Sequence, residues 1–201
     1  MRQFTAERGA STADEIWLVE HPAVFTFGLA GKAEHLLDAG DIPVHRTERG
    51  GQVTYHGPGQ LIAYTLFDLK RAGITVRGLV CLLEKSAIAY FAQLGIATCL
   101  RTGAPGVYLK NSSGEAGAKI AALGLKVSRG CSYHGIALNI HMNLKPFTRI
   151  NPCGYTGLEV TDVHSVLGDA PLIGEASQQF AALIQEQFDA QIKSTNPERP
   201  S

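Results

Sequence analysis

The stretch AKIAALGLKVSRGCSYHGIALNIHM, residues 118–142, contains two runs, 119–127 and 134–142, whose apolar residues predict β-strands. Shorter runs of this kind occupy 15–21, 24–28, 43–46 and 60–69, and glycine or proline bounds most of them. Apolar residues at steps of three and four predict helices over 76–95 and over 173–188. Many strands without regular βαβ alternation favour a single α+β domain over residues 1–201, with a mixed or antiparallel sheet and helices packed on one side.

The first of the two strands places Ala122 and Gly124 on one face, where such small residues leave room for a ligand. The opposite face is an apolar stripe that Lys119 heads. A lysine at a strand end can simply reach out to water along its stem. The alternative is a partly desolvated amine that serves as a base or as the partner of an anion. The pattern leaves both interpretations open.

The second strand places Gly135 and Ala137 on one face and His134 on the other. His134 and His141 are seven positions apart, so a regular strand sends their rings to opposite sides. The spacing of Cys131 and His134 is odd as well. The residues therefore predict no metal site here.

The composition limits the class of protein. A chain of 201 residues with 45% hydrophobic content can bury a core of its own. Its 18 basic and 18 acidic residues cancel, which argues against a nucleic-acid partner. The first residues lack the apolar core of a secretion signal, and no long apolar run occurs, so we expect a cytoplasmic protein outside the membrane. In that compartment the four cysteines are expected to be reduced thiols.

The segment RGGQVTYHGPGQL, residues 49–61, is rich in glycine. Glycine permits unusual backbone conformations and the close approach of a ligand, so the segment can be a multi-turn connection or a binding loop. It has neither the GxxxxGK[ST] spacing nor a GxGxxG that opens a helix. Arg49, Tyr55 and His56 add a cation, an aromatic ring and a titratable ring, which favours the binding loop.

The segment RINPCGYTG, residues 149–157, places Cys153 between a proline and a glycine. Proline fixes the backbone before the cysteine and glycine frees it afterwards, so the loop positions one side chain sharply. The cysteine can be a small buried hydrophobe or a reactive thiol. A thiol attacks only as the thiolate, which requires a cation or base nearby. Lys119, His56 and His134 are the candidates.

Five motifs, RGGQVTYHGPGQL, APGVYL, KIAALGL, HGIALNI and RINPCGYTG, occur in an order and at separations that resemble the lipoyl(octanoyl) transferase family. This family is a branch of the biotin/lipoate protein ligase superfamily. The resemblance extends from about Glu15 to about Val166. It implies a biotin/lipoate ligase-like domain that moves an octanoyl group from acyl carrier protein to a lysine of a lipoyl domain, a step of protein lipoylation.

Residue by residue, the resemblance implies that Cys153 carries the acyl group as a thioester and that Lys119 activates the thiol and acts as base. His134 is a possible auxiliary residue, and the sequence decides neither its role nor that of His56. The residues that would line the acyl pocket are Arg49, Gly50, Gly51, Gln52, Val53, Thr54, Tyr55, His56, Ala122, Leu123, Gly124, Gly135, Ile136 and Ala137.

The same resemblance implies the partners. The donor would be acyl carrier protein with octanoate on its phosphopantetheine, and the acceptors would be lipoyl domains of 2-oxoacid dehydrogenase complexes and the glycine cleavage H protein. Because thioester exchange changes the free energy little and the final amide is more stable, we expect no ATP, metal or other cofactor. Transfer through an acyl-enzyme predicts ping-pong kinetics. Each methylene buried in an apolar tunnel contributes about 0.8 kcal/mol.

Two features depart from the family pattern. Only fourteen, mostly polar residues precede EIWLVEHP, where family members usually carry a further strand and helix, which suggests a truncated N-terminal element. The stretch KNSSGEAGA, residues 110–118, lengthens the loop before Lys119.

Three other functions remain as alternatives. An ATP-dependent lipoate-protein ligase of the same superfamily uses no cysteine nucleophile, so Cys153 in its loop argues against it. A catalytically silent module could bind an acyl group or a carrier protein without turnover. A cysteine hydrolase would need a water path to the thioester, which nothing in the sequence indicates. The tolerated chain length, the lipoyl proteins served and the oligomeric state cannot be derived from the sequence.

Overall fold

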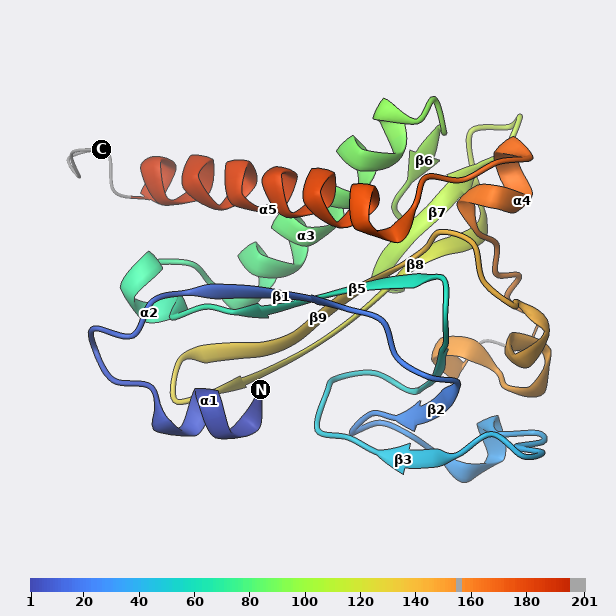
Figure 1. The fold of residues 1–201 in the computed structure, drawn as a ribbon, viewed down its shortest axis with the longest axis horizontal. Coiled ribbons are helices and arrows are strands. Elements are labelled where there is room, and N and C mark those ends of the chain that lie inside the picture. The colour runs from blue at the N-terminus through green and yellow to red at the C-terminus, as the bar shows by residue number, and fades with distance from the viewer. Residues whose placement is uncertain (155–156, 196–201) are drawn as a thin grey trace.

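The computed structural model describes residues 1–154 and 157–195, except for the side chains of Cys153 and Thr195. A six-stranded sheet of order β1-β5-β9-β8-β7-β6 forms its centre, and all its neighbouring strands are antiparallel (Figure 1). The strands are β1 (Glu15–Val19), β5 (Gln60–Leu66), β6 (Thr98–Cys99), β7 (Gly106–Lys110), β8 (Ala116–Ser128) and β9 (Cys131–Asn139). The prediction of a mixed or antiparallel sheet is confirmed.

The hairpin of β8 and β9 crosses the middle of this sheet. Its two-residue loop, Arg129 and Gly130, has a positive φ at both positions, 53° and 86°. Two left-handed residues in a row are the type I′ arrangement, whose twist matches that of the flanking strands. The loop therefore fixes the register, in which Ala122 pairs with Ala137.

A second, three-stranded sheet of order β3-β2-β4 lies below the first in Figure 1. It consists of β2 (Val24–Phe27), β3 (Val44–Arg46) and β4 (Val53–His56), with β2 parallel to β3 and antiparallel to β4. A small core that includes Phe25, Tyr55 and Phe147 supports it. The expected connection over 49–61 is thus only partly a loop, because β4 lies within it.

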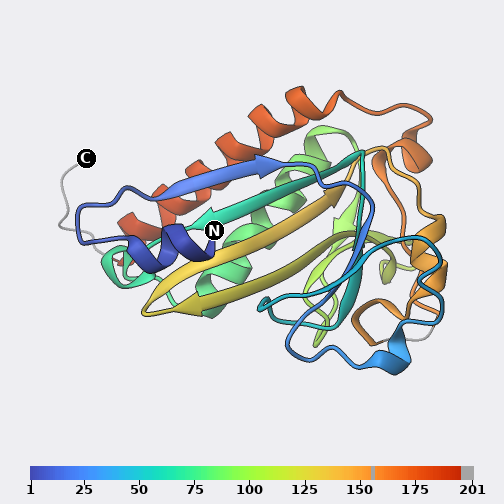
Figure 2. The ribbon, with the colours of Figure 1, turned by 60° about the horizontal axis from the view of Figure 1, so that its bottom comes forward.

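Two long helices cover one face of the six-stranded sheet, α3 (Val76–Gln93) and α5 (Ile173–Thr195) (Figures 1 and 2). Thr75 caps α3 by accepting a hydrogen bond from the backbone nitrogen of Gly78. The remaining helical segments are α1 (Arg2–Glu7), α2 (Leu69–Ala72), α4 (Val163–Leu167) and the 3₁₀ turns η1 (Ala33–His35), η2 (Lys145–Arg149) and η3 (Pro152–Gly154). In the described part of the chain, no helix has the length and apolar character to cross a membrane.

The main core lies between these two helices and the sheet. Buried residues from both layers form it, among them Leu61, Ala63, Ala121, Ile136 and Leu138 from the sheet and Leu79, Leu83, Phe180 and Ile184 from the helices. On the opposite face of the central strands, the short helix α1 packs near the β8–β9 loop, and the three-stranded sheet approaches the rest of the face. The predicted α+β class is confirmed. Both long helices lie on one side, as predicted, but α1 lies on the other, and the part of that face which α1 leaves free is where a site can form.

Candidate active site

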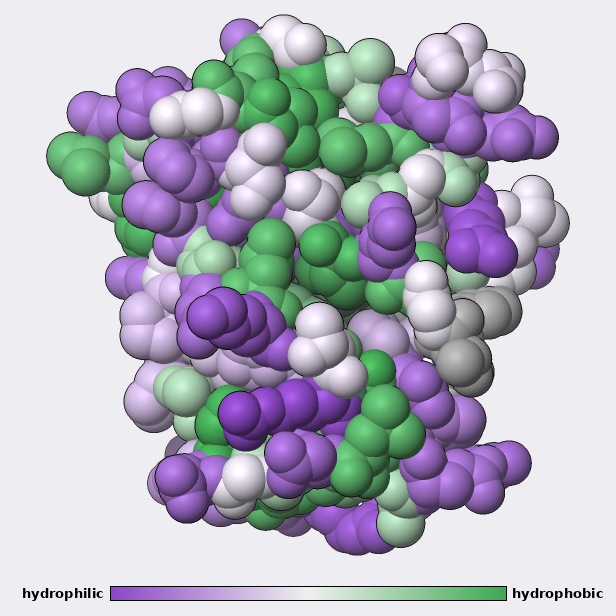
Figure 3. Space-filling model, turned by 90° about the vertical axis from the view of Figure 1, so that its right-hand side faces the viewer, coloured by the Kyte–Doolittle hydropathy of each residue, from purple (hydrophilic) through white to green (hydrophobic). Residues whose placement is uncertain are grey.

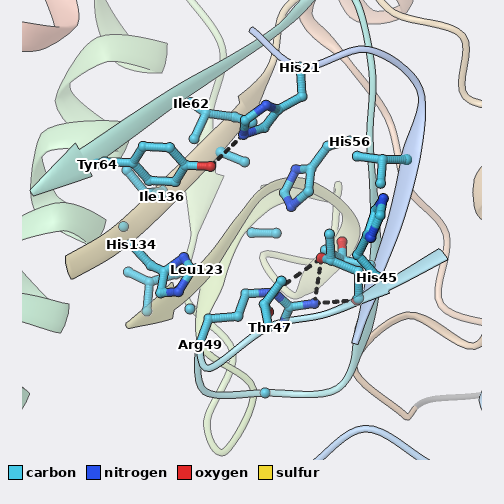
Figure 4. A pocket seen from close by; sticks show the side chains of 18 of the residues that line it. His21, His45, Thr47, Arg49, His56, Ile62, Tyr64, Leu123, His134 and Ile136 are labelled. Atoms are coloured by element: carbon cyan, nitrogen blue, oxygen red, sulfur yellow. Dashed lines mark hydrogen bonds between the residues drawn. The ribbon is translucent and has the colours of Figure 1, made fainter. Parts of the chain in front are cut away.

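A cavity of about 400 Å³ lies between this free face and the segments around β2, β3 and β4 (Figure 4). Four small residues on paired positions of β8 and β9 form its floor: Ala122, Gly124, Gly135 and Ala137. The alternation of residues along the strands predicted that these four residues share one face, and they do. The volume is in the range of sites that bind small molecules.

Two of the floor residues have little room for a side chain. A Cβ at Gly135 would lie 1.9 Å from the carbonyl oxygen of Ala63 in the neighbouring strand. A Cβ at Gly124 would lie 2.9 Å from the carbonyl oxygen of Gly50. The loop above Gly124 is held there because the nitrogen of Gly50 donates to the carbonyl of Leu125 over 2.8 Å. The cavity is therefore roofed by backbone that approaches the floor closely.

Arg49 fixes this roof to the smaller sheet. Its buried guanidinium donates to the carbonyl oxygen of Thr26 over 2.6 Å and to the Thr26 hydroxyl over 3.0 Å. It also donates to the carbonyl of Gly50 over 3.0 Å. The guanidinium borders the cavity, so its positive charge disfavours a second cation there.

Four histidines line the cavity: His21, His45, His56 and His134. Burial lowers the pKa of His56 to about 4, against a raising effect of its hydrogen bond to Gln60. Burial, helped by the charge of Arg49, lowers the pKa of His134 to about 4. Burial also lowers the pKa of His21. At neutral pH these three rings are therefore neutral and compatible with an apolar ligand.

A row of hydrogen bonds leads from His56 to the segment behind the cavity. His56 Nδ1 lies 2.7 Å from Gln60 Oε1, Gln60 Nε2 donates to Asn139 Oδ1 over 2.9 Å, and Asn139 Nδ2 donates to the Thr161 carbonyl over 2.8 Å. Because the Gln60 oxygen accepts, His56 Nδ1 is the protonated nitrogen, and Nε2 is the acceptor. The nitrogen of Thr161 in turn donates to the Lys119 carbonyl over 2.9 Å.

His134 does not lie on the face that alternation predicts. Its φ is 63°, a left-handed conformation inside β9 that is strained for a residue of this size, at roughly 1–3 kcal/mol. The twist brings its ring to the cavity, stacked on Tyr133 with 5.2 Å between centroids, and 6.0 Å from the ring of Tyr64. The prediction was wrong because it assumed a regular strand.

Lys119 is also on the other face from the one predicted. Val107 pairs with Ala121 and the next residue, Tyr108, pairs with Lys119, so β8 has one extra residue, Ile120, at this point. Such a β-bulge reverses the alternation beyond it. The lysine therefore shares the face of Tyr108, opposite to that of Ala121.

The amine of Lys119 is buried, with 2% of the residue exposed. Its Nζ donates to the Pro105 carbonyl over 3.0 Å and lies 5.1 Å from the centre of the Tyr108 ring. The interpretation in which the stem reaches out to water is therefore wrong. The lysine is a desolvated group held in one place, as a base or electrostatic partner requires.

The turn that carries Cys153 lies at the rim of the cavity. The nitrogen of Asn151 donates to the His35 carbonyl over 2.8 Å. A Cβ at Gly154 would lie 3.5 Å from Gln52 Cγ and 3.6 Å from His35 Nε2, and Gln52 lines the cavity. The side chain of Cys153 lies outside the part of the chain that the structure describes, and so does the predicted pairing of its thiol with Lys119.

The chain that follows this turn returns to Lys119. The nitrogen of Lys119 donates to the carbonyl of Glu159 over 2.8 Å, and the two segments form a parallel bridge between Lys119 and Val160. Only a few residues separate Cys153 from this bridge. The backbone thus brings the cysteine turn and the buried lysine into one region.

Most of the predicted pocket residues line the cavity. They are Arg49, Gly51, Gln52, Val53, Thr54, His56, Ala122, Leu123, Gly124, Gly135, Ile136 and Ala137, together with His134. Gly50 instead bonds to β8, and Tyr55 packs in the small core between Phe25 and Phe147. In the described residues, no cluster of three histidine, cysteine or acidic side chains could hold a metal ion.

Sequence reasoning missed several residues of the cavity: Met1, His21, Pro22, Val24, Thr26, His45, Thr47, Ile62 and Tyr64. His21 and Tyr64 hydrogen-bond to each other over 2.5 Å, from Nε2 to the hydroxyl oxygen (Figure 4). Burial raises the pKa of Tyr64 to about 12, so its hydroxyl keeps the proton. Tyr64 itself was a usable signal, because it places a polar hydroxyl within a largely apolar strand.

Comparison with known proteins identifies close relatives. The family model described as "Lipoyl protein ligase A/B catalytic domain" matches residues 1–185. A curated "Octanoyltransferase" of Ectopseudomonas mendocina (strain ymp) is 56% identical over 180 residues, which are 90% of this chain and 85% of the relative. The "Octanoyltransferase" of Ralstonia pickettii (strain 12J) is 58% identical over 163 residues, 81% of this chain and 71% of the relative.

Solved structures show the same fold at low sequence identity. A bi-partite lipoate protein ligase from Thermoplasma acidophilum, described with its E2 lipoyl domain, is 14% identical with a TM-score of 0.70, over 98% of this chain and 85% of that chain. A lipoate-protein ligase A bound with ATP, also 14% identical, gives a TM-score of 0.67 over 98% of this chain and 87% of that one.

Proposed function

The chain belongs to the family of the lipoyl protein ligase A/B catalytic domain and catalyses octanoyl transfer in protein lipoylation, and from this premise we propose that the octanoyl group passes through a thioester on Cys153. The observation that carries the proposal is the cavity. Gln52 lines it and lies next to Gly154 of the cysteine turn, so a chain attached at Cys153 can extend over the floor of small residues.

The first half-reaction loads the enzyme. The thiolate of Cys153 attacks the carbonyl carbon of the donor thioester, a new carbon–sulfur bond forms, and the carbon–sulfur bond to the donor breaks. The donor leaves as a thiol after taking up a proton. Lys119, buried and oriented by the Pro105 carbonyl and the Tyr108 ring, supplies the nearby base or cation that a thiol needs.

The second half-reaction transfers the group to an amine. The acceptor lysine of a lipoyl domain attacks the thioester, the amide bond forms, and the cysteine sulfur leaves with a proton. Lys119 takes the proton that the attacking amine releases and returns one to the sulfur. The octanoyl chain stays in the cavity during both steps, stabilised by burial of its methylenes at about 0.8 kcal/mol each.

The donor in this proposal is acyl carrier protein, which presents the octanoyl group on phosphopantetheine. The acceptors are lipoyl domains of 2-oxoacid dehydrogenase complexes and the H protein, and the reaction takes place in the cytoplasm without ATP or metal. Both proteins would approach the end of the molecule that holds the cysteine turn, where apolar and polar side chains mix (Figure 3). Val166, Leu167 and Leu172 are among the exposed apolar residues of the segments around α4.

The test is intact-mass analysis after incubation with octanoyl-acyl carrier protein, followed by a lipoyl domain without ATP. Wild type should gain one octanoyl group and pass it on. Cys153→Ala should gain none, and Lys119→Ala should acylate at least about 100-fold more slowly. Cys81→Ala, which changes an exposed cysteine on α3, is the matched control and should behave as wild type.

An equal adduct yield in wild type and Cys153→Ala would refute the thioester. The fold is shared with an ATP-bound lipoate-protein ligase, so free octanoate with ATP is tested in parallel. Modification of the lipoyl domain only in that second mixture would identify a ligase instead.

A further inference from the structure

Two non-glycine residues have a positive φ in the described chain, Arg129 and His134. Arg129 belongs to the type I′ loop between β8 and β9, where the hairpin requires this conformation. His134 pairs with Leu125 inside the ladder, where nothing in the strand pairing requires it. A strained residue in the wall of a binding cavity indicates a functional constraint. Because of its left-handed backbone conformation, the ring of His134 borders the cavity and does not point into the core under the helices.

His134 lies at the end of the cavity that is remote from the cysteine turn. The strand β8 starts the floor near Lys119, where the chain returning from that turn is bonded, and continues past Ala122 and Gly124 to Leu125, the partner of His134. At a rise of about 3.3 Å per residue, this path covers roughly 15–20 Å. The ring of His134 therefore stands at the far end of this path, where only a chain longer than octanoyl would reach.

The chemistry of this end differs from that of the floor. The ring of His134 meets the ring of Tyr64, whose hydroxyl is bonded to His21 (Figure 4). No described residue bonds to the ring nitrogens of His134, in contrast to His56, which is bonded to Gln60. The nitrogens therefore depend on water that reaches them through the cavity.

We propose that His134 sets the longest acyl chain that this site accepts, an inference that rests on the proposed octanoyl transfer. A chain that stops short of the ring leaves its nitrogens hydrated. A longer chain covers them with methylenes, and a polar group buried without a partner opposes binding. The ring cannot easily turn aside, because it is stacked on Tyr133 and its backbone is fixed in the β8–β9 ladder. The substrates are therefore acyl thioesters of medium length, with an upper limit set at this residue.

The proposal is tested with His134→Gly. Glycine adopts a φ of 63° without strain, so the substitution removes the ring and leaves the backbone in its native conformation. Acyl carrier protein loaded with chains of six to fourteen carbons is offered together with a lipoyl domain, and the modified domain is quantified by mass. The ratio of dodecanoyl to octanoyl transfer should rise about tenfold or more over wild type, the size of effect that added methylenes have in an apolar pocket.

Arg129→Gly is the matched control. It relieves the same kind of backbone strain at φ 53°, in a loop that does not border the cavity, and should leave the ratio as in wild type. His134→Asn is the second variant, since asparagine tolerates the left-handed region and is shorter than histidine. It should extend the accepted chain length less than His134→Gly does, because a longer chain would still bury its polar amide.

The outcomes separate two failures. If wild type transfers no octanoyl group from the carrier protein, the proposed function is refuted. If wild type transfers it and both His134 variants keep the wild-type chain-length profile, or Arg129→Gly shifts the profile equally, His134 does not set the limit.

Discussion

The helix face and the cavity face of the six-stranded sheet are made by alternate residues of the same strands. On the helix face, Ala121 and Leu138 pack into a closed core under α3 and α5. On the cavity face, Ala122 and Ala137 leave a space that no described side chain fills. One strand thus supplies stability with one set of residues and a binding volume with the other. Substitutions one position apart should therefore have opposite consequences.

The largest loss of stability is expected on the helix face. Phe180 of α5 is fully buried, and its ring lies 5.9 Å from that of Tyr90. Phe180→Ala should lower the free energy of unfolding by about 3–5 kcal/mol through lost burial and the cavity left behind. Urea unfolding followed by circular dichroism measures it. The folded fraction should transfer octanoyl groups at the wild-type rate, and a lower rate per folded molecule would mean that the two faces are coupled.

A smaller loss is expected at the floor, where backbone limits the space. In Gly135→Ala, the new methyl group would collide with the Ala63 carbonyl in the adjacent strand, which should cost about 3 kcal/mol. In Gly124→Ala the nearest atom is the Gly50 carbonyl in a loop, which can shift, so the cost should be nearer 1 kcal/mol. Urea midpoints of the two variants test this order. The reverse order would show that the loop, and not the ladder, fixes the floor.

Acid should destabilise the protein through the cavity face. With its pKa lowered to about 4, His56 stays neutral in the folded protein down to that pH, whereas in the unfolded chain it takes up a proton below about pH 6.5. Between these values the unfolded state binds more protons, so the free energy of unfolding falls as the pH falls, by up to about 1.4 kcal/mol per pH unit. The half-buried His134 adds a smaller change in the same direction.

The experiment compares unfolding of wild type and His56→Gln at pH 7.5 and pH 5. Glutamine does not titrate, so the variant should lose about 2 kcal/mol less than wild type over this interval. Carboxylates titrate equally in both proteins and cancel in the difference. Parallel pH profiles would mean that His56 is protonated in the folded state.

The sequence predicted correctly those features of the fold that depend on local periodicity. The helices over 76–95 and from 173, the α+β class and the small-residue face of Ala122, Gly124, Gly135 and Ala137 follow from steps of 3.6 and 2. The faces of Lys119 and His134 were wrong, because a bulge and a left-handed residue interrupt the step of two at those positions. Neither interruption has a local signal, since each depends on the partner strand.

The residues above the floor were harder to predict. A step of two tells which residues of a strand share a face, but not which distant segment covers that face. His21 and His45 therefore gave no signal, although both border the cavity. The glycine-rich loop was recognised by its composition, and the strand β4 within it was missed because its four residues are flanked by turns.

The smallest change in stability should accompany a clear loss of function. Ala137→Val adds two methyl groups to the floor, where the space is empty, and valine suits a strand, so the free energy of unfolding should change by less than about 0.5 kcal/mol. The added groups occupy volume that the octanoyl chain needs, and acylation of Cys153 should slow about tenfold. Ala121→Val is the matched control on the neighbouring strand, because Ala121 is fully buried against the helices. Overpacking there should lower the free energy of unfolding by about 1–3 kcal/mol. Acylation of the folded fraction should be unchanged. Equal stability losses in the two variants would show that both faces are closely packed, and the volume assigned to the acyl chain would then have to lie elsewhere.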